Sequence, residues 1–241
     1  MTPLGAAPPD GPCDVQATRI IAVRHGETAW NVDTRIQGQL DIPLNATGRE
    51  QARRLGLALA DEAVDALYSS DLLRAMQTAQ ALADAQPPCT IVADTGLRER
   101  GFGAFEGLTY AQVAQTWPEQ SERWRRRDPD FGPEGGEVLR DFFARCVDTL
   151  TRLAALHPGQ TIAVVAHGGV MDCLYRAATR LALQAPRTWQ LGNASINRAL
   201  FTPQGFTLVG WSDTSHLEDP ALDESNHLPS LDAPALARSA P

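Results

Sequence analysis

Two apolar, β-branched segments that each stop at a His-Gly pair set the strongest constraint on how this chain folds. Residues 19–24 run into His25-Gly26, and residues 161–166 run into His167-Gly168. Short apolar runs bounded in this way predict buried β-strands. In a parallel sheet the carboxyl ends of the strands meet at one edge, where open α/β folds place their chemistry. A lone histidine at a strand end is usually structural, but two at one edge predict imidazoles that face each other.

Strands and helices alternate along the rest of the chain, which predicts one α/β domain with a mostly parallel sheet. A capping box at Thr47 and Glu50 predicts a helix that continues to about Asp61. We expect further helices at 72–85, at 139–153 and after 168, strands at 19–24, 64–68, 90–92 and 161–166, and a hairpin of strands at 196–201 and 206–211.

Three stretches differ from this regular pattern. Residues 1–17 are rich in Pro, Gly and Ala without periodicity, which predicts a flexible N-terminal leader. Residues 217–241 are acidic and proline-rich, which predicts a mobile C-terminal tail. Residues 101–136 are irregular and predict a lid-like, partly helical excursion over one edge of the sheet. The functional domain is therefore expected to span residues 18–216.

Composition restricts how this chain can recognise phosphate. None of its 241 residues is lysine, so all 21 basic side chains are arginines. That excludes a Schiff-base lysine and a P-loop whose lysine reaches the phosphates. The net charge of −8 lies mainly in the two ends, with −4 in residues 217–241 and −2 in residues 1–17. The acidity argues against non-specific binding to nucleic acid.

The cysteines and the apolar runs indicate the compartment. The four cysteines form no CxxC pair and no metal-ligand spacing, which predicts reduced thiols in a cytoplasmic protein; they are Cys13, Cys89, Cys146 and Cys173. No apolar stretch approaches the length of a membrane span, and the first 17 residues lack the pattern of a signal peptide. We therefore expect no membrane partner. The five histidines also lack ligand spacing, so we expect no metal site.

Arginines beside the predicted strand ends extend the two histidines into a candidate anion site. Arg24 immediately precedes His25, and Arg74 lies in the first turn of the helix after the second strand. Guanidinium groups bind phosphate oxygens bidentately and stay charged at any working pH. The helix start after His167 adds amide donors and a positive dipole end. The alternative for Arg74 is a surface ion pair with Asp71, three residues before it.

Five motifs in this sequence resemble those of one known family. They are "RHGETAWN", "RIQGQLDIPLNATG", "YSSDLLRAMQTA", "LRERGFGAFEGLT" and "VVAHGGVM", in that order within residues 19–216. The set resembles the histidine phosphatase superfamily, also called phosphoglycerate mutase-like. The resemblance implies an α/β three-layer sandwich with helices on both faces of the sheet. It also implies an enzyme that needs no metal and no cofactor.

The resemblance further implies a role for each matching position. His25 matches the nucleophile that forms a phosphohistidine, and Glu99 matches the acid that protonates the leaving oxygen and later deprotonates water. Arg24, Arg74 and His167 match the residues that hold the phosphoryl oxygens, and the expected substrate pocket adds Thr28, Asn31, Gln37, Gly38 and Gly168. A neutral imidazole is a competent nucleophile near pH 7. Positioned cations, including a His167 kept protonated by nearby carboxylates, would stabilise the transferring phosphoryl group without metal.

Several side chains leave alternatives open. Glu106 is a second candidate acid, although a loop residue that bonds backbone amides is the favoured interpretation. The Arg123–Arg127 run either overhangs the pocket and selects a second acidic group or, as favoured, forms a solvated helix face. His157 is expected to be structural and His227 uninvolved, whereas His216 lies either near the pocket or in solvent.

The same pocket serves two reactions, and the sequence favours one of them. The glycolytic-type mutases of the family carry a longer insertion after the acid, with a tyrosine and a lysine that are missing directly after Glu99 here. We therefore expect a phosphatase acting on small phosphorylated metabolites such as sugar phosphates, phosphoglycerate derivatives, phosphoserine or ribazole phosphate. Cofactor-dependent phosphoglycerate mutase activity is the alternative. A non-catalytic phosphate-binding module ranks lower because His25, Glu99 and His167 are all present. The sequence leaves a homodimer open.

Overall fold

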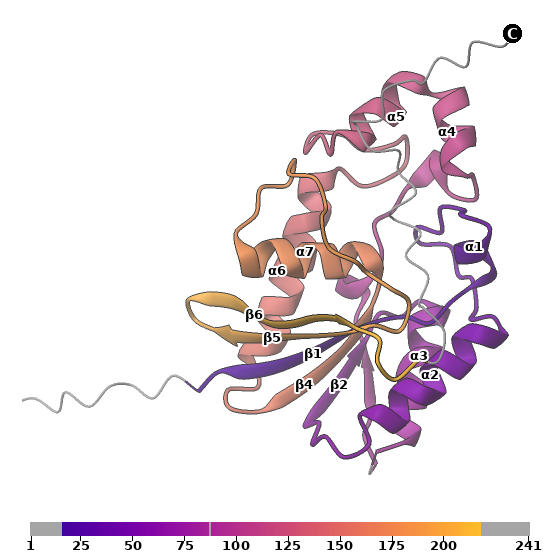
Figure 1. The fold of residues 1–241 in the computed structure, drawn as a ribbon. Coiled ribbons are helices and arrows are strands. Elements are labelled where there is room, and N and C mark those ends of the chain that lie inside the picture. The colour runs from indigo at the N-terminus through magenta and orange to yellow at the C-terminus, as the bar shows by residue number, and fades with distance from the viewer. Residues whose placement is uncertain (1–15, 87, 218–241) are drawn as a thin grey trace, which may run out of the picture.

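A six-stranded sheet organises the computed structural model, which describes residues 16–86 and 88–217 (Figure 1). The strand order is β3-β2-β4-β1-β5-β6. The first four strands in this order run parallel, whereas β5 pairs antiparallel with both β1 and β6. The strands span β1 Thr18–Arg24, β2 Ala66–Ser69, β3 Ile91–Ala93, β4 Thr161–Ala166, β5 Ile196–Thr202 and β6 Gly205–Asp213. The predicted mostly parallel sheet and the late hairpin are both confirmed.

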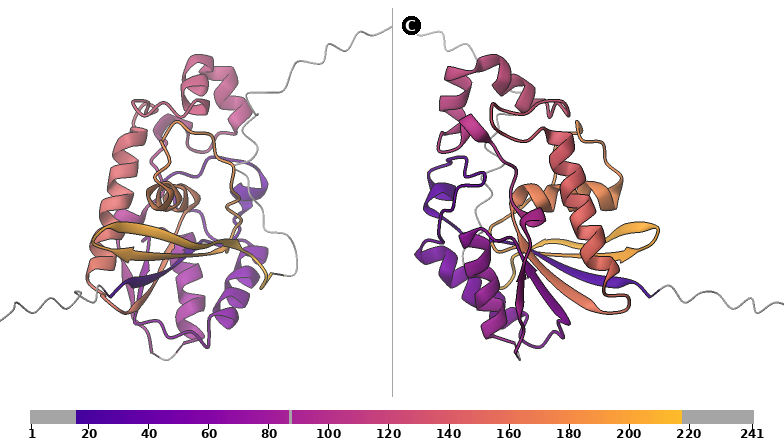
Figure 2. Two further views of the ribbon diagram at one scale, coloured as in Figure 1. Left: turned by 60° about the vertical axis from the view of Figure 1, so that its left-hand side comes forward. Right: turned by 180° about the vertical axis from the view of Figure 1, so that it is seen from behind.

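Helices cover both faces of the sheet, as the two views in Figure 2 show. Helices α2 (Ala46–Ala58) and α3 (Leu73–Asp84) pack on one face, and α6 (Leu139–Ala155) and α7 (Gly168–Thr179) pack on the other. Strand β1 supplies both cores because its side chains alternate. Ile21 and Val23 join the α2 and α3 cluster, and Ile20 and Ala22 join the α6 and α7 cluster. Burying each such aliphatic side chain stabilises the fold by about 1.5–3 kcal/mol. The three-layer α/β sandwich is therefore confirmed.

The segment 101–136 forms a smaller body at one end of the molecule (Figure 1). It contains the 3₁₀ turn η2 (Gly103–Phe105) and helices α4 (Tyr110–Thr116) and α5 (Pro118–Arg125). Its own apolar cluster buries Phe105, Val113 and Phe131 together with Ile36, which follows the short helix α1 (Ala29–Val32). Backbone hydrogen bonds join Ile36 to Leu108 and Gly107. The excursion is thus fixed to the segment that follows β1, and not only to its own neighbours in sequence.

The start of α2 differs from the predicted capping box. The N-cap is Asn45, whose side chain accepts from the amide of Gly48 at 2.8 Å, and the helix ends at Ala58. Glu50 instead accepts hydrogen bonds from Arg53 and Arg54 on the exposed side of the helix. The helix therefore begins two residues before the position that the S/T-x-x-E pattern predicts. Asn45 serves as the N-cap, a position for which asparagine is a preferred residue.

The ends of the chain lie outside the described residues except for positions 16, 17 and 217, and so do Cys13 and His227. The other three cysteines carry free thiols, with Cys146 and Cys173 buried between α6 and α7 and Cys89 partly buried. These three agree with the expectation of reduced thiols, two of them in the core.

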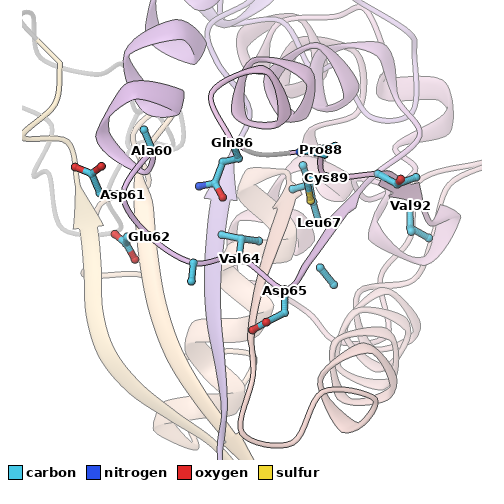
Figure 3. Close-up of a pocket in the computed structure, with 13 residues that line it drawn as sticks. Ala60, Asp61, Glu62, Val64, Asp65, Leu67, Gln86, Pro88, Cys89 and Val92 are labelled. Atoms are coloured by element: carbon cyan, nitrogen blue, oxygen red, sulfur yellow. The ribbon is translucent and has the colours of Figure 1, made fainter.

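A hollow of about 670 Å³ opens beside the amino end of β2, as Figure 3 shows. Two of the acidic side chains that line it, Asp65 and Glu62, are already engaged in the fold. Asp65 accepts from the amide of Thr161 at 2.7 Å, and Glu62 pairs with Arg198. This hollow is at the opposite end of the parallel strands from the two histidines that follow β1 and β4. We therefore look for chemistry at the carboxyl ends.

Candidate active site

His25 follows the last residue of β1 and is held in a neutral state. Its amide donates to the carbonyl of Ala166 at 2.9 Å, and its side chain is almost fully buried. Its Nδ1 lies 2.7 Å from the carbonyl oxygen of Gly26, which can only accept. A neutral ring therefore carries its proton on Nδ1 and leaves the lone pair on Nε2. Burial, and then the charges of Arg74 and Arg24, lower the pKa of His25 well below its ordinary value.

His167 follows β4 and faces His25 across 5.2 Å between ring centroids. It is the N-cap residue of α7, and its Nε2 lies 2.8 Å from the hydroxyl of Ser70. Burial lowers the pKa of His167 well below its ordinary value, and Arg74, His25 and Arg24 lower it further. The expectation that carboxylates keep His167 protonated is therefore wrong for this structure. Cations, not carboxylates, dominate its surroundings.

Arg24 and Arg74 bring two buried guanidinium groups to the histidine pair. Arg24 donates through Nη1 to the carbonyl of Leu191, and a Cβ placed on Gly168 would lie 3.5 Å from its Nε. Arg74 donates to the carbonyls of Gly38 and Leu40, each at 2.8 Å. The alternative of a surface ion pair between Arg74 and Asp71 is wrong. Arg74 is 1% exposed, and Asp71 accepts both of its ion-pair hydrogen bonds from Arg98.

Glu99 reaches the same place from the irregular segment after the 3₁₀ turn η1 (Thr95–Leu97). One carboxylate oxygen accepts from the amide of Gly169 at 3.0 Å, and the other accepts from the backbone amide of the next residue, Arg100, at 2.8 Å. A Cβ at position 169 would lie 2.1 Å from the carboxylate and would displace it, so this contact needs a glycine there. The first residues of α7 thus contact three predicted site groups in turn. His167 faces His25, Gly168 lies against Arg24, and Gly169 binds Glu99.

Arg145 on α6 fixes the backbone around Glu99. Its guanidinium donates to the carbonyls of Gly96, Arg98 and Glu99 at 2.9–3.3 Å. It also pairs with Glu137 through two hydrogen bonds of 2.8 and 2.7 Å. A planar guanidinium with five donors is suited to hold several carbonyls at once. Glu99 lies in no helix or strand, but the loop that carries it is held in place by these hydrogen bonds.

Four of the five predicted pocket residues lie in the segment between β1 and α2, which includes α1, and the fifth, Gly168, starts α7. Thr28 and Asn31 are buried and form a capping box at the start of α1. The hydroxyl of Thr28 accepts from the amide of Asn31, and Oδ1 of Asn31 accepts from the amide of Thr28. Gly38 adopts φ +52 and gives its carbonyl to Arg74, so it does border a site arginine. The side chain of Gln37 is 9% exposed, and its Oε1 has no hydrogen-bond partner within the part of the chain that the structure describes.

The alternatives for other side chains resolve as follows. Glu106 accepts from the amides of Gln39 and Phe102, which confirms the loop-bonding interpretation. His157 bonds Tyr68 and Gln160 and is structural. His216 is partly buried, and burial lowers its pKa, so the fully exposed alternative is wrong.

The arginine run at the end of α5 is a charged helix face with one exception. Arg123, Arg125 and Arg126 pair with acids of the same segment. Arg127 turns inward instead and pairs with Asp172 on α7 at 2.6 Å. The solvated-face interpretation is therefore wrong for Arg127. Residue Asp172, itself buried, also accepts from Arg176, so the excursion is tied to the helix that starts at the site.

Sequence reasoning missed several residues around the site. Ser70 lies inside the third motif, and no pattern there indicates that its hydroxyl contacts His167. Arg145 was not singled out, because it lies off the apolar stripe of a helix that showed only core periodicity. Asn193 lies in an aperiodic stretch before β5, and no pattern there indicated that it bonds the carbonyl of His25.

Two features that are absent from the described residues, 16–86 and 88–217, bear on other functions. These residues contain no group of three or more His, Cys, Asp or Glu side chains arranged to hold a metal ion. Over the same ranges, every helix falls short of the length and hydrophobicity needed to cross a membrane.

Comparison with known proteins places this arrangement of residues in a family. Residues 20–214 match the model of the histidine phosphatase superfamily (branch 1). The chain belongs to the histidine phosphatase superfamily. This assignment confirms the resemblance seen in the sequence motifs.

Relatives of the chain include both mutase-like proteins and phosphatases. It is 39% identical to phosphoglycerate mutase-like protein 4 of Arabidopsis thaliana, over 88% of this chain and 92% of that protein. It is 37% identical to the metal-independent phosphoserine phosphatase of the same plant, over 84% of each. Among solved structures, a mycobacterial glucosyl-3-phosphoglycerate phosphatase superposes with a TM-score of 0.73 at 32% identity, covering 81% of this chain and 99% of that one.

Proposed function

We propose that this protein is a metal-independent phosphatase that hydrolyses small phosphomonoesters through a phosphohistidine at His25. One observation carries the proposal. His25 is buried and neutral, with its proton on Nδ1, and lies beside a second imidazole and the guanidinium groups of Arg24 and Arg74. A lone pair on Nε2 in a cationic, desolvated site is suited to attack a phosphoryl group.

The first half of the reaction transfers the phosphoryl group to the enzyme. His25 Nε2 forms a bond to phosphorus as the ester P–O bond breaks, and Glu99 gives its proton to the leaving oxygen. Charge on the equatorial oxygens is stabilised by Arg24, Arg74 and His167 and by the positive end of the α7 dipole. Because these donors are fixed by backbone hydrogen bonds, little reorganisation is needed as the charge develops.

The second half releases phosphate. Glu99, now a carboxylate, takes a proton from water as that water attacks phosphorus and the Nε2–P bond breaks. His25 returns to its neutral form, with Nδ1 still donating to the carbonyl of Gly26. The segment 101–136, which lies within the proposed domain 18–216, would act as a lid over the phosphorylated site.

Substrate class and location extend this proposal. Phosphoserine and glucosyl-3-phosphoglycerate appear in the names of two relatives, and both are phosphomonoesters that carry a carboxylate. We expect substrates of this kind, with Thr28, Asn31, Gln37, Gly38 and Gly168 bordering them. The free thiols at 89, 146 and 173 favour a cytoplasmic enzyme. A homodimer stays a prediction for size-exclusion chromatography.

Phosphoglycerate mutase activity is the second candidate, and the first relative named above favours keeping it. The two reactions share the phosphohistidine and differ in what accepts the phosphoryl group. A mutase must retain the phosphorylated intermediate until a second hydroxyl arrives, whereas a phosphatase admits water. Incubation with 3-phosphoglycerate, primed with a trace of its bisphosphate, separates them, because only a mutase then converts the bulk of the 3-phosphoglycerate to 2-phosphoglycerate.

The proposal is tested with a panel of phosphorylated metabolites, phosphate release being measured for the wild type and for His25→Ala. We expect the variant to lose at least about 10³-fold in kcat because the nucleophile is gone. His157→Gln is the matched control, since that histidine bonds Tyr68 and Gln160 away from the site. EDTA should leave the wild-type rate unchanged. Wild-type turnover by His25→Ala, or loss of activity in EDTA, would overturn the proposal.

A further inference from the structure

The peptide group between His25 and Gly26 is held from two sides by buried side chains. On one side the carbonyl oxygen of His25 accepts from the amide of Ala194 and from Nδ2 of Asn193, both at 3.1 Å. On the other side the amide of Gly26 donates to the hydroxyl of Thr78 on α3, also at 3.1 Å. Asn193 and Thr78 are both 0% exposed. The plane of this peptide is therefore fixed by three hydrogen bonds shielded from water.

The orientation of that plane controls the imidazole of His25. The ring is oriented by its bond from Nδ1 to the carbonyl of Gly26, the very next residue. Gly26 has no side chain, so its backbone torsions are freer than those of other residues. The peptide that carries this carbonyl is held on its far side, where the amide of Glu27 donates to Oε1 of Gln51 at 2.8 Å. On its near side the carbonyl direction depends on how the preceding peptide is held. The bonds from Asn193 and Thr78 supply that restraint.

The backbone beside Asn193 is shaped for the same contact. Ala194 has φ +54, a left-handed conformation that residues with a Cβ rarely adopt. That conformation points its amide at the carbonyl of His25. Strain of this kind persists only where the surroundings enforce it, and it concentrates at functional sites.

We propose that Asn193 is a positioning residue for the nucleophile. It holds the His25–Gly26 peptide so that Nδ1 of His25 stays bonded to the carbonyl of Gly26 and Nε2 is presented to the phosphoryl group. The inference rests on the proposed phosphohistidine chemistry. Nδ2 of Asn193 also lies 3.4 Å from Oδ1 of Asn31. Both neighbours of Nδ2 are acceptors, which fixes the orientation of the amide.

Asn197 offers a matched control. It is also 0% exposed, on the adjoining strand β5, and its Nδ2 donates to the carbonyl of Ala22 at 3.1 Å. Its Oδ1 accepts from the amide of Ser212 at 2.8 Å. Truncating it removes bonds of the same kind from β1, but leaves the His25–Gly26 peptide untouched.

The test compares Asn193→Ala, Asn197→Ala and Thr78→Val. For each, kcat and KM are measured with p-nitrophenyl phosphate, the inhibition constant with inorganic phosphate, and stability by urea unfolding. We expect Asn193→Ala and Thr78→Val to lower kcat about 10- to 100-fold, because small misplacements of a reacting atom are costly. Their inhibition constants for phosphate should stay within about threefold, since neither variant removes a guanidinium bond of Arg24 or Arg74. Thr78→Val also removes the bond from the Thr78 hydroxyl to the carbonyl of Arg74, and Asn193→Ala does not. Asn197→Ala should lose stability while kcat stays within about threefold.

A spectroscopic readout separates positioning from general weakening. In the wild type, imidazole ¹⁵N shifts should show His25 with a protonated Nδ1 and a bare Nε2. Asn193→Ala should populate the other tautomer, whereas Asn197→Ala should not.

Three results would overturn the inference. Asn193→Ala and Asn197→Ala could reduce kcat equally. Alternatively, Asn193→Ala could weaken phosphate inhibition as much as it lowers kcat, while Thr78→Val keeps the wild-type kcat. Asn193 would then act through its contact with Asn31 and not through the His25–Gly26 peptide. If Asn193→Ala does not fold, a wild-type kcat for Thr78→Val is sufficient to reject the inference. Failure of the proposed function itself is distinct, because His25→Ala would then retain activity.

Discussion

The nucleophile side and the acid side of this site are held in different ways. His25 and His167 follow two adjacent central strands, and both side chains are almost completely buried. Glu99 lies outside every helix and strand and is partly exposed. The first pair takes its position from the sheet ladder, and the acid takes its position from Arg145 and Gly169.

This difference follows from what each half of the reaction requires. A nucleophile must meet phosphorus at a defined distance and angle, which suits the stiffest part of the fold. An acid must exchange protons with the leaving group and then with water, which suits a group near solvent. The following predictions test whether the two sides are separable, beginning with the largest expected effect.

Removing the acid should depend on the leaving group. Glu99→Gln keeps the shape and an acceptor oxygen for the amide of Gly169, but it removes the proton that the leaving oxygen needs. We expect kcat to fall about 10²- to 10⁴-fold with an alkyl phosphomonoester. The loss with p-nitrophenyl phosphate should be much smaller, since that leaving group departs without a proton. Equal losses with both substrates would show that Glu99 is not the acid.

Acid should destabilise the nucleophile side. The pKa values of His25 and His167 are lowered well below 6.5 in the folded protein, so below pH 6.5 the unfolded chain binds protons that the folded chain does not. Stability is therefore full above pH 6.5 and falls as the pH drops towards the lowered pKa values. Each imidazole should contribute a slope of up to about 1.4 kcal/mol per pH unit.

Urea unfolding between pH 5 and pH 8 measures this slope. The double variant His25→Asn with His167→Asn should show a flatter profile, because its site no longer carries the two titrating groups. A profile as steep as that of the wild type would mean that other groups, such as His216, carry the dependence.

Weakening the support of the acid should produce a smaller copy of the Glu99 effect. Arg145→Met removes the donors to the carbonyls of Gly96, Arg98 and Glu99. We expect kcat for an alkyl phosphomonoester to fall about tenfold, with a smaller fall for p-nitrophenyl phosphate. Arg152→Met is the control, because that arginine is on the same helix but pairs with Asp94 away from Glu99. Equal effects from the two variants would contradict a positioning role for Arg145.

The two sides also differ in how far the sequence could predict them. His25 and His167 were predictable because an apolar run fixes a strand and its end fixes where the next residue lies. Arg24 followed from its place beside His25. The protonation of His167 was not predictable, since it depends on which charges surround the ring in three dimensions.

The acid side was predictable in identity but not in support. The motif containing Glu99 and Glu106 resembles the family, yet neither residue lies in a periodic element. Their partners, Arg145 and Gln39, come from an apolar-striped helix and an irregular loop, and no local pattern reports such contacts. Side chains that fix an irregular backbone across tens of residues leave little trace in a single sequence.

The smallest expected effect concerns Glu106 and decides which carboxylate is the acid. Glu106 accepts through Oε1 from the amides of Gln39 and Phe102, and an amide oxygen can do the same. Glu106→Gln should therefore keep kcat within about twofold for alkyl and aryl phosphomonoesters alike. Glu106→Ala should cost about 1–3 kcal/mol in the free energy of unfolding, because two amides lose their acceptor. If instead Glu106→Gln reproduces the leaving-group dependence expected of Glu99→Gln, the proton comes from Glu106. Glu99 is then a structural carboxylate, and the acid side of the site has to be described from the contacts of Glu106.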